Sequence, residues 1–327
     1  MSETSQEIID KYSISEEQVE EIFQKIIENL TLTARPVENP VAIIVGGQCG
    51  AGKSGLMSYT HKMFGSEPYL PFDGSTPPQG EFIEDNVVQI EDDEFRAYFP
   101  NEREIALKYP EEYIQITNKL TNNLTARVFE WLSQHSYNII FHQTLKNTRI
   151  ADDGIVKLKN LGYAVVVRAL AVNELESRMS MIERSLGQLQ KKGYCRNVTT
   201  ADHDKTYFGM PDTLDYIENN GRFDILQVFK RGPENDEPIM VYTKINPNSD
   251  TLSVLSTFPY LLTVDVDFGY NSAKEALIAT RAEEREKFLP LAEKRLGDVK
   301  KQQGNRVISS QIVELEEKLQ SLQSTKK

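Results

Sequence analysis

The sequence predicts an α/β fold in which a mostly parallel sheet is flanked by helices. Two observations predict it: short apolar runs alternate with helical stretches, and a glycine-rich loop joins one of these runs to a helix. Strands that alternate with helices are typical of a parallel sheet covered on both faces. At 327 residues the chain is long enough to bury a large core.

The predicted strands of this sheet are apolar runs at residues 41–45, 87–90, 138–141 and 164–172. The predicted helices lie at residues 13–30, 55–64, 111–134 and 150–160, and a loop rich in Pro and Gly is predicted at residues 66–80. In the first helix Ser15 can act as the cap with Gln18 reaching back. One apolar stripe follows: Val19, Ile22, Phe23, Ile26, Ile27 and Leu30. We therefore interpret this helix as part of the fold.

The pattern changes after residue 222. Short strands at residues 225–229, 239–242 and 260–266 are separated by turn-rich segments, which indicates an antiparallel edge or a small β extension. A charged helix is predicted at residues 273–295. The last helix has apolar residues at coiled-coil spacing over only about two heptads, so we favour packing on its own core: Ile308, Ile312, Leu315, Leu319 and Leu322. The chain is thus divided into a core at residues 1–222 and a segment at residues 223–327, whose β extension and C-terminal helices pack on that core.

Composition and charge narrow the function classes. The net charge of −12 argues against nucleic acid as a partner, because a phosphate backbone would be repelled. No run of 18 apolar residues occurs, so no membrane partner is expected. The amino terminus lacks a secretory layout, which predicts a cytoplasmic protein and leaves export by another route open. Cys49 and Cys195, the two cysteines, predict neither a disulfide scaffold nor a zinc site.

Residues 47–54 form the motif G-x-x-x-x-G-K-[ST] of a P-loop, between a predicted strand and a predicted helix. They are Gly47, Gln48, Cys49, Gly50, Ala51, Gly52, Lys53 and Ser54. Such a loop turns backbone N–H groups toward phosphates, while its lysine reaches the β- and γ-phosphates and its serine ligates magnesium. The motif therefore predicts a P-loop NTPase or kinase-type sheet that binds ATP or GTP with Mg²⁺. Cys49 is interpreted as a small residue needed only for its backbone.

An acidic cluster of Glu91, Asp92, Asp93 and Glu94 follows the second predicted strand, at the sheet edge where ligands bind. If the chain stays extended there, Glu91 and Asp93 lie on one side. A carboxylate at this place could accept the proton of a substrate hydroxyl or hold magnesium through water. The alternative is a solvated acidic turn that caps the next helix.

A basic segment at residues 178–196 is predicted to begin as a helix and to loosen at Gly187 and Gly193. Its cations are Arg178, Arg184, Lys191, Lys192 and Arg196. Such a segment could close over phosphates as a lid; the alternative is an ordinary solvated face. His203 and Asp204 follow it, and we expect a structural or substrate-positioning role for His203.

Together these blocks resemble the zeta toxin family of P-loop kinases over residues 10–250. The resemblance is carried by GGQCGAGKS, IEDDEFR with a downstream Pro100, YNIIFHQT, MIERS near residues 181–185, and Arg196 followed seven residues later by His-Asp. It implies phosphorylation of a sugar-nucleotide hydroxyl, most typically the 3′-hydroxyl of UDP-N-acetylglucosamine, with ATP as donor. It also implies that Asp93 is the catalytic base, Lys53 the P-loop lysine, and Arg184 and Arg196 the arginines that hold the phosphates.

Two departures concern the acceptor side. The family carries acids where this chain has Ala126 and His142, although Thr144 is kept. We expect Glu91, His142 and Thr144 to bind the acceptor, but another nucleotide or cofactor, such as NAD, stays open as the substrate. A rival hypothesis is a regulatory module in which ATP only switches a partner-binding surface. The expected partners are a nucleotide-like small molecule and a protein antitoxin or inhibitor.

Overall fold

The computed structural model describes residues 5–62, 64, 66–68, 82–84, 86–196, 198–233, 237–256, 268–303 and 309–324. Within those ranges, none of the helices combines the length and the apolarity that crossing a bilayer requires.

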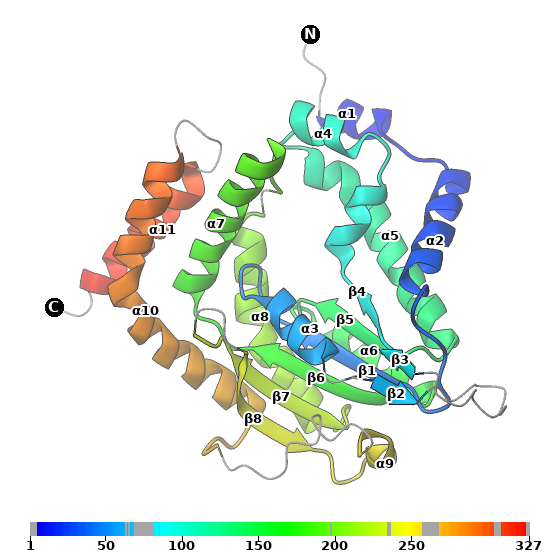
Figure 1. Cartoon of the computed structure of the whole chain (residues 1–327). Coiled ribbons are helices and arrows are strands. Elements are labelled where there is room, and N and C mark those ends of the chain that lie inside the picture. Colours follow the sequence, from blue (N-terminus) through cyan, green and yellow to red (C-terminus); the bar gives the residue numbers. More distant parts are fainter. Residues whose placement is uncertain are drawn as a thin grey trace.

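A six-stranded sheet in the order β4-β5-β1-β6-β7-β8 forms the centre of the molecule (Figure 1). Five of its strands are parallel, and β8 pairs antiparallel with β7 at one edge. The strands are β1 (Val41–Gly46), β4 (Val88–Ile90), β5 (Ile139–Gln143), β6 (Ala164–Leu170), β7 (Ile225–Lys230) and β8 (Ile239–Ile245). The predicted α/β class with a mostly parallel sheet is confirmed.

Alternating residues of the strands build two apolar cores, one on each face of the sheet. In β1, Ala42 and Ile44 face the larger core, whereas Val41, Ile43 and Val45 face the other. The larger core is covered by α2 (Glu16–Leu30), α5 (Tyr113–Gln134), α6 (Thr148–Asn160) and α8 (Thr200–Asn219). The smaller core is covered by α3 (Lys53–His61) and α9 (Leu252–Leu255).

The helix predicted at residues 13–30 is confirmed as α2, preceded by α1 (Ser5–Lys11). Ser15 caps α2, and the side chain of Gln18 accepts from the backbone N–H of Ser15, so the predicted capping box is present. Between β4 and α5 lie the 3₁₀ helix η1 (Asp92–Tyr98) and α4 (Glu102–Lys108). These elements place the acidic cluster at the carboxyl end of β4.

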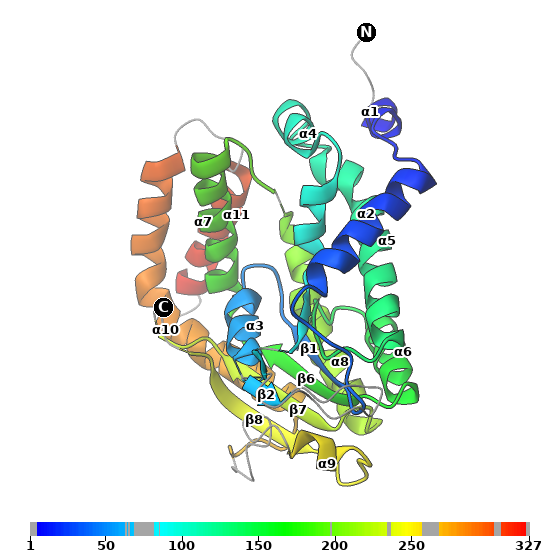
Figure 2. The same cartoon turned by 45° about the vertical axis from the view of Figure 1, so that its right-hand side comes forward.

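A third apolar cluster joins α7 (Glu174–Lys192), α10 (Ala273–Gln303) and α11 (Ser309–Ser324). Ile312, Leu315 and Leu319 of α11 are buried in it, so the described part of the last helix packs on its own chain, as predicted. Figures 1 and 2 show these three helices on one side of the carboxyl ends of the strands, with α4 and α5 on the other.

One predicted loop and one predicted strand differ from the structure. The loop predicted at residues 66–80 begins with a short strand, because β2 (Ser66–Pro68) pairs antiparallel with β3 (Phe82–Glu84). The strand predicted at residues 225–229 is β7, which continues the parallel sheet beside β6 instead of forming an antiparallel extension; only β8 is antiparallel. The strand predicted at residues 260–266 and Ile308 lie outside the described residues. The division of the chain at residue 222 stays a prediction.

Candidate active site

A cavity of about 480 Å³ lies at the carboxyl ends of β1, β4 and β5. Its wall contains the P-loop from Cys49 to Ser54, together with residues from η1, the end of β5, α7 and the end of β7. Five basic and three acidic side chains line it: Lys53, Lys146, Arg184, Arg196 and Arg231, and Glu91, Asp92 and Asp93. In a chain of net charge −12, this local excess of cations suits a phosphorylated ligand.

The P-loop has the backbone that phosphate binding needs. Gly50 and Gly52 have φ values of +75° and +88°, which favour glycine. A Cβ on Gly50 would also stand 2.0 Å from the carbonyl oxygen of Ser177. The loop is therefore packed directly against the first turns of α7, and only glycine fits at the contact.

Lys53 is held inside the loop. Its ammonium donates to the carbonyls of Gly47 at 2.7 Å and Gln48 at 3.1 Å, and the residue is only 8% exposed. Burial lowers the pKa of Lys53. The ammonium of Lys53, which is predicted to contact phosphate, therefore lies within the loop. The side chain of Gln48 is buried behind the loop and does not line the cavity.

Ser54 is the second residue of α3 and is exposed at the cavity wall. Among the described residues, no group of three or more His, Cys, Asp or Glu side chains could hold a metal ion alone. Mg²⁺ in nucleotide sites keeps several waters and takes phosphate oxygens, so it needs few protein ligands. The Ser54 hydroxyl, with the carboxylates across the cavity, fits that requirement.

The acidic cluster does not stay extended as predicted. Because η1 begins at Asp92, a tight helical turn replaces the strand alternation, and Glu91, Asp92 and Asp93 all line the cavity. Burial, with the neighbouring carboxylates Glu94 and Asp92, raises the pKa of Glu91. The acidic cluster lies at the ligand edge of the sheet, as predicted. The prediction that an extended chain puts Glu91 and Asp93 on one side is wrong, because the chain turns into η1 at Asp92.

Two arginines face Asp93. Arg196 forms an ion pair with its Oδ2, and Arg96 Nε lies 3.5 Å from its Oδ1. Oδ1 has no hydrogen-bond partner although it is buried. Arg96 is itself buried and anchored on α5, where it donates to Asn118 at 2.6 Å and to Thr117. Asp93 Oδ1 therefore faces the Arg96 guanidinium but accepts no hydrogen bond from the described part of the chain.

His142 and Thr144 come from the end of β5 and line the cavity as predicted. His142 Nδ1 lies 3.6 Å from Asp92 Oδ1, too far for a hydrogen bond, and neither ring nitrogen has a hydrogen-bond partner. Burial and the charge of Lys53 lower the pKa of His142. Leu145, which follows Thr144 beside the cavity, is buried and has a φ of +52°, which is a strained conformation for leucine.

The basic segment begins as a helix and loosens at Gly193, as the sequence predicts, but it does not loosen at Gly187. Helix α7 continues through Gly187 and ends at Gly193, where φ is +83°. Of the five predicted cations only Arg184 and Arg196 line the cavity, whereas Arg178 binds Asp204 behind it. Apolar burial of α7 against α10 and α11 explains why the helix continues through Gly187, which glycine content alone does not reveal.

Arg231 lines the cavity and escaped the sequence analysis. It follows β7 directly and donates to the carbonyl of Gly50 at 2.6 Å, while Glu176 and Ser180 of α7 bind the same guanidinium. A basic residue at the end of a parallel strand is the signal that could have found it, but the sequence predicts residues 225–229 as part of an antiparallel edge or a small β extension. Ala126, in contrast, is exposed on α5 and does not line the cavity.

The sequence model of the family described as "Zeta toxin" matches residues 77–243, just over half of the chain. A protein named Toxin zeta from Streptococcus agalactiae is 25% identical over 236 residues, which are 72% of this chain and 74% of that protein. Toxin PezT from Streptococcus pneumoniae serotype 4 is 24% identical over 206 residues, 63% of this chain and 74% of that protein.

Among solved structures, one from the PezAT chromosomal toxin–antitoxin system of Streptococcus pneumoniae superposes with a TM-score of 0.59. The sequence identity is 21%, and the match covers 89% of this chain and 98% of that chain. The two share the same α/β fold.

Proposed function

Because this chain belongs to the zeta toxin family, we propose that it is an ATP-dependent kinase that phosphorylates a hydroxyl group of a nucleotide-like small molecule. One observation carries the proposal: a single cavity joins the P-loop, a carboxylate with an unused oxygen, and two arginines from the far wall. Phosphoryl transfer depends on such positioning and charge stabilisation, with little covalent chemistry for the protein to do.

The donor side is assigned to the P-loop and the arginines. Lys53, Arg184 and Arg196, which line the cavity, would neutralise charge that spreads over the transferred phosphoryl group. Mg²⁺, held by Ser54 and reached by the carboxylates through water, would supply further charge neutralisation. Since Lys53 already binds two carbonyls of its own loop, it needs little movement to share its third donor with a phosphate.

The acceptor side is assigned to Asp93, Glu91, His142 and Thr144. The oxygen of the acceptor hydroxyl would attack the γ-phosphorus of ATP, and ADP would leave. Asp93 Oδ1 would accept the proton of that hydroxyl. His142, whose ring nitrogens have no hydrogen-bond partner among the described residues, would bind a polar group of the acceptor. We propose UDP-N-acetylglucosamine as the acceptor, with NAD as the second candidate because His142 stands where the family carries an acid.

A toxin role with a protein antitoxin belongs to the same proposal. Toxin zeta and Toxin PezT are named as toxins, and PezAT is a toxin–antitoxin system. Depletion of an essential sugar nucleotide would be the harmful activity, and a partner that covers the cavity would block it.

The proposal is tested by incubating the purified protein with ATP, Mg²⁺ and a metabolite extract to which UDP-N-acetylglucosamine and NAD are added. Mass spectrometry is expected to show one compound that gains a phosphoryl group, and Lys53→Ala is expected to abolish the gain. ATP binding without any phosphorylated product would instead support the regulatory module.

A further inference from the structure

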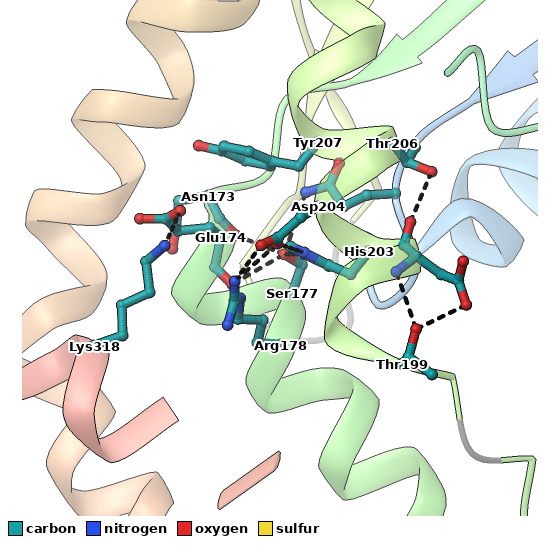
Figure 3. A network of polar contacts seen from close by, with 12 residues as sticks. Asn173, Glu174, Ser177, Arg178, Thr199, His203, Asp204, Thr206, Tyr207 and Lys318 are labelled. Atoms are coloured by element: carbon teal, nitrogen blue, oxygen red, sulfur yellow. Dashed lines mark hydrogen bonds and ion pairs between the residues drawn. The ribbon is translucent and has the colours of Figure 1, made fainter. Parts of the chain in front are cut away.

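A buried polar network behind the P-loop is centred on His203 of α8 (Figure 3). The imidazole is fully buried, with Nε2 2.8 Å from Ser177 Oγ and Nδ1 2.8 Å from Asp204 Oδ1. Arg178 donates to both oxygens of Asp204 at 2.8 Å. The network therefore joins α8 to the first turns of α7.

The order Ser177–His203–Asp204 has the contacts of a hydrolytic triad, but it cannot act as one. Ser177 is fully buried and does not line the cavity. A nucleophile must reach a substrate carbonyl, so the contacts serve another purpose.

The hydrogen bonds of the network run in one direction. A carboxylate can only accept, so His203 Nδ1 carries the hydrogen toward Asp204. Burial lowers the pKa of His203 and so favours the neutral ring, in which Nε2, 2.8 Å from Ser177 Oγ, accepts from the hydroxyl. The carbonyls of Asn173 at 2.9 Å and Glu174 at 3.2 Å also lie within reach of this hydroxyl, but both belong to the helical backbone, whereas donation to Nε2 gives the buried ring nitrogen its hydrogen bond. His203 thus determines where the Ser177 hydroxyl points.

That hydroxyl reaches the P-loop through Gln48. The Gln48 amide donates to Ser177 Oγ at 3.3 Å and to the carbonyl of Val172 at 2.7 Å, and its oxygen accepts from Arg281 of α10 at 3.2 Å. The backbone carbonyl of the same Gln48 holds the ammonium of Lys53. A change in the Gln48 side chain would therefore move the cation that faces the phosphates.

We propose that His203 is a positioning residue for the P-loop: oriented by Asp204, it fixes the Ser177 hydroxyl, which fixes Gln48 and the carbonyl that holds Lys53. The inference rests on the proposed function in one respect, namely that ATP binds at this loop.

Calorimetric binding of a non-hydrolysable ATP analogue with Mg²⁺ tests it. We expect His203→Met, which keeps the bulk and removes the acceptor, to weaken binding about tenfold. His203→Gln, whose side-chain oxygen can accept from Ser177, is expected to stay within about threefold of the wild type. The control is Thr206→Val on the same helix, which removes a buried hydroxyl that bonds only the Asp202 carbonyl. Equal binding by the wild type and His203→Met would overturn the proposal.

A second measurement does not depend on nucleotide. With Cys195→Ser as background, Cys49 of the P-loop is the one remaining thiol. Because Cys49 is partly exposed at the cavity wall, its alkylation rate reports the conformation of the loop. We expect His203→Met to speed alkylation about tenfold and Thr206→Val to leave it unchanged. Unchanged rates in His203→Met would overturn the proposal. A wild type that fails to bind the analogue, while alkylation still responds to His203→Met, would reject the kinase and leave the positioning role standing.

Discussion

Arg231 connects three parts of the cavity wall that are far apart in the sequence. It extends from the end of β7, binds the carbonyl of Gly50 in the P-loop, and is held by Glu176 and Ser180 of α7. A planar guanidinium can make these contacts at once, whereas an ammonium is a single point of charge. Arg231 therefore fixes the P-loop relative to the helix that carries Arg184.

Removal of Arg231 should consequently affect the ATP side of the reaction. Arg231→Ala is expected to raise the KM for ATP about tenfold, because charged hydrogen bonds to the loop are lost. Arg231→Lys should restore little of this. Steady-state kinetics at varied ATP checks the effect, with Arg149→Ala as control, since the Arg149 side chain is 90% exposed on α6. An unchanged KM in Arg231→Ala would contradict the assignment.

Glycine is required at one P-loop position and replaceable at a neighbouring one. Gly50→Ala places a Cβ against the Ser177 carbonyl at positive φ, whereas a Cβ on helical Gly55 meets nothing within 4 Å. Urea unfolding is expected to show a loss of about 2 kcal/mol or more for Gly50→Ala. Gly55→Ala should be neutral or stabilising by about 0.5–1 kcal/mol. A tolerated Gly50→Ala would mean that the loop does not pack on α7 as described.

At the scale of elements, α7 serves both the cavity and the C-terminal helices. The first turns of α7 contact the P-loop, and Arg184 of the same helix lines the cavity. The apolar face of α7 is buried against α10 and α11. The stability of this three-helix cluster therefore bears on the position of Arg184.

The cluster makes a testable contribution to stability. Leu315 on α11 is 2% exposed, whereas Val313 on the same helix is 50% exposed. Leu315→Ala is expected to lower the free energy of unfolding by about 2–4 kcal/mol, and Val313→Ala by less than about 0.5 kcal/mol. Chemical unfolding followed by circular dichroism measures both. Similar values for the two variants would contradict the packing of α11.

Most elements could be predicted from local signals. The capping box at Ser15 and the apolar runs of β1 and β6 are short-range patterns that tertiary structure did not override. The continuous α7 could not be predicted, because the residues that cover its apolar face lie more than a hundred positions away in the sequence. Arg231 was missed for a similar reason, since strand order decides which residues meet at the P-loop.

At the scale of the whole molecule, two histidines link stability to pH: His203 is fully buried, and His142 is partly buried at the cavity wall. Burial lowers the pKa of His142 and of His203. The unfolded chain takes up these protons near pH ~6.5, whereas the folded chain does so only at lower pH. As pH falls below about 6.5, the unfolded state binds more protons, so the free energy of unfolding decreases.

Urea unfolding near pH 7.5 and near pH 5.5 should therefore show lower stability at the acidic value. The double variant His142→Gln/His203→Gln should lose less stability than the wild type over the same interval. Stability that is independent of pH in the wild type would contradict neutral, buried imidazoles.

The central claim is that one cavity holds both the phosphate donor and the base. It is tested most directly by single-turnover transfer of γ-labelled phosphate from ATP to UDP-N-acetylglucosamine or NAD, for the wild type and Asp93→Asn. We expect label on one of these acceptors with the wild type and transfer that is at least about a hundredfold slower with Asp93→Asn, at unchanged ATP affinity. Transfer at the wild-type rate by Asp93→Asn would contradict the claim.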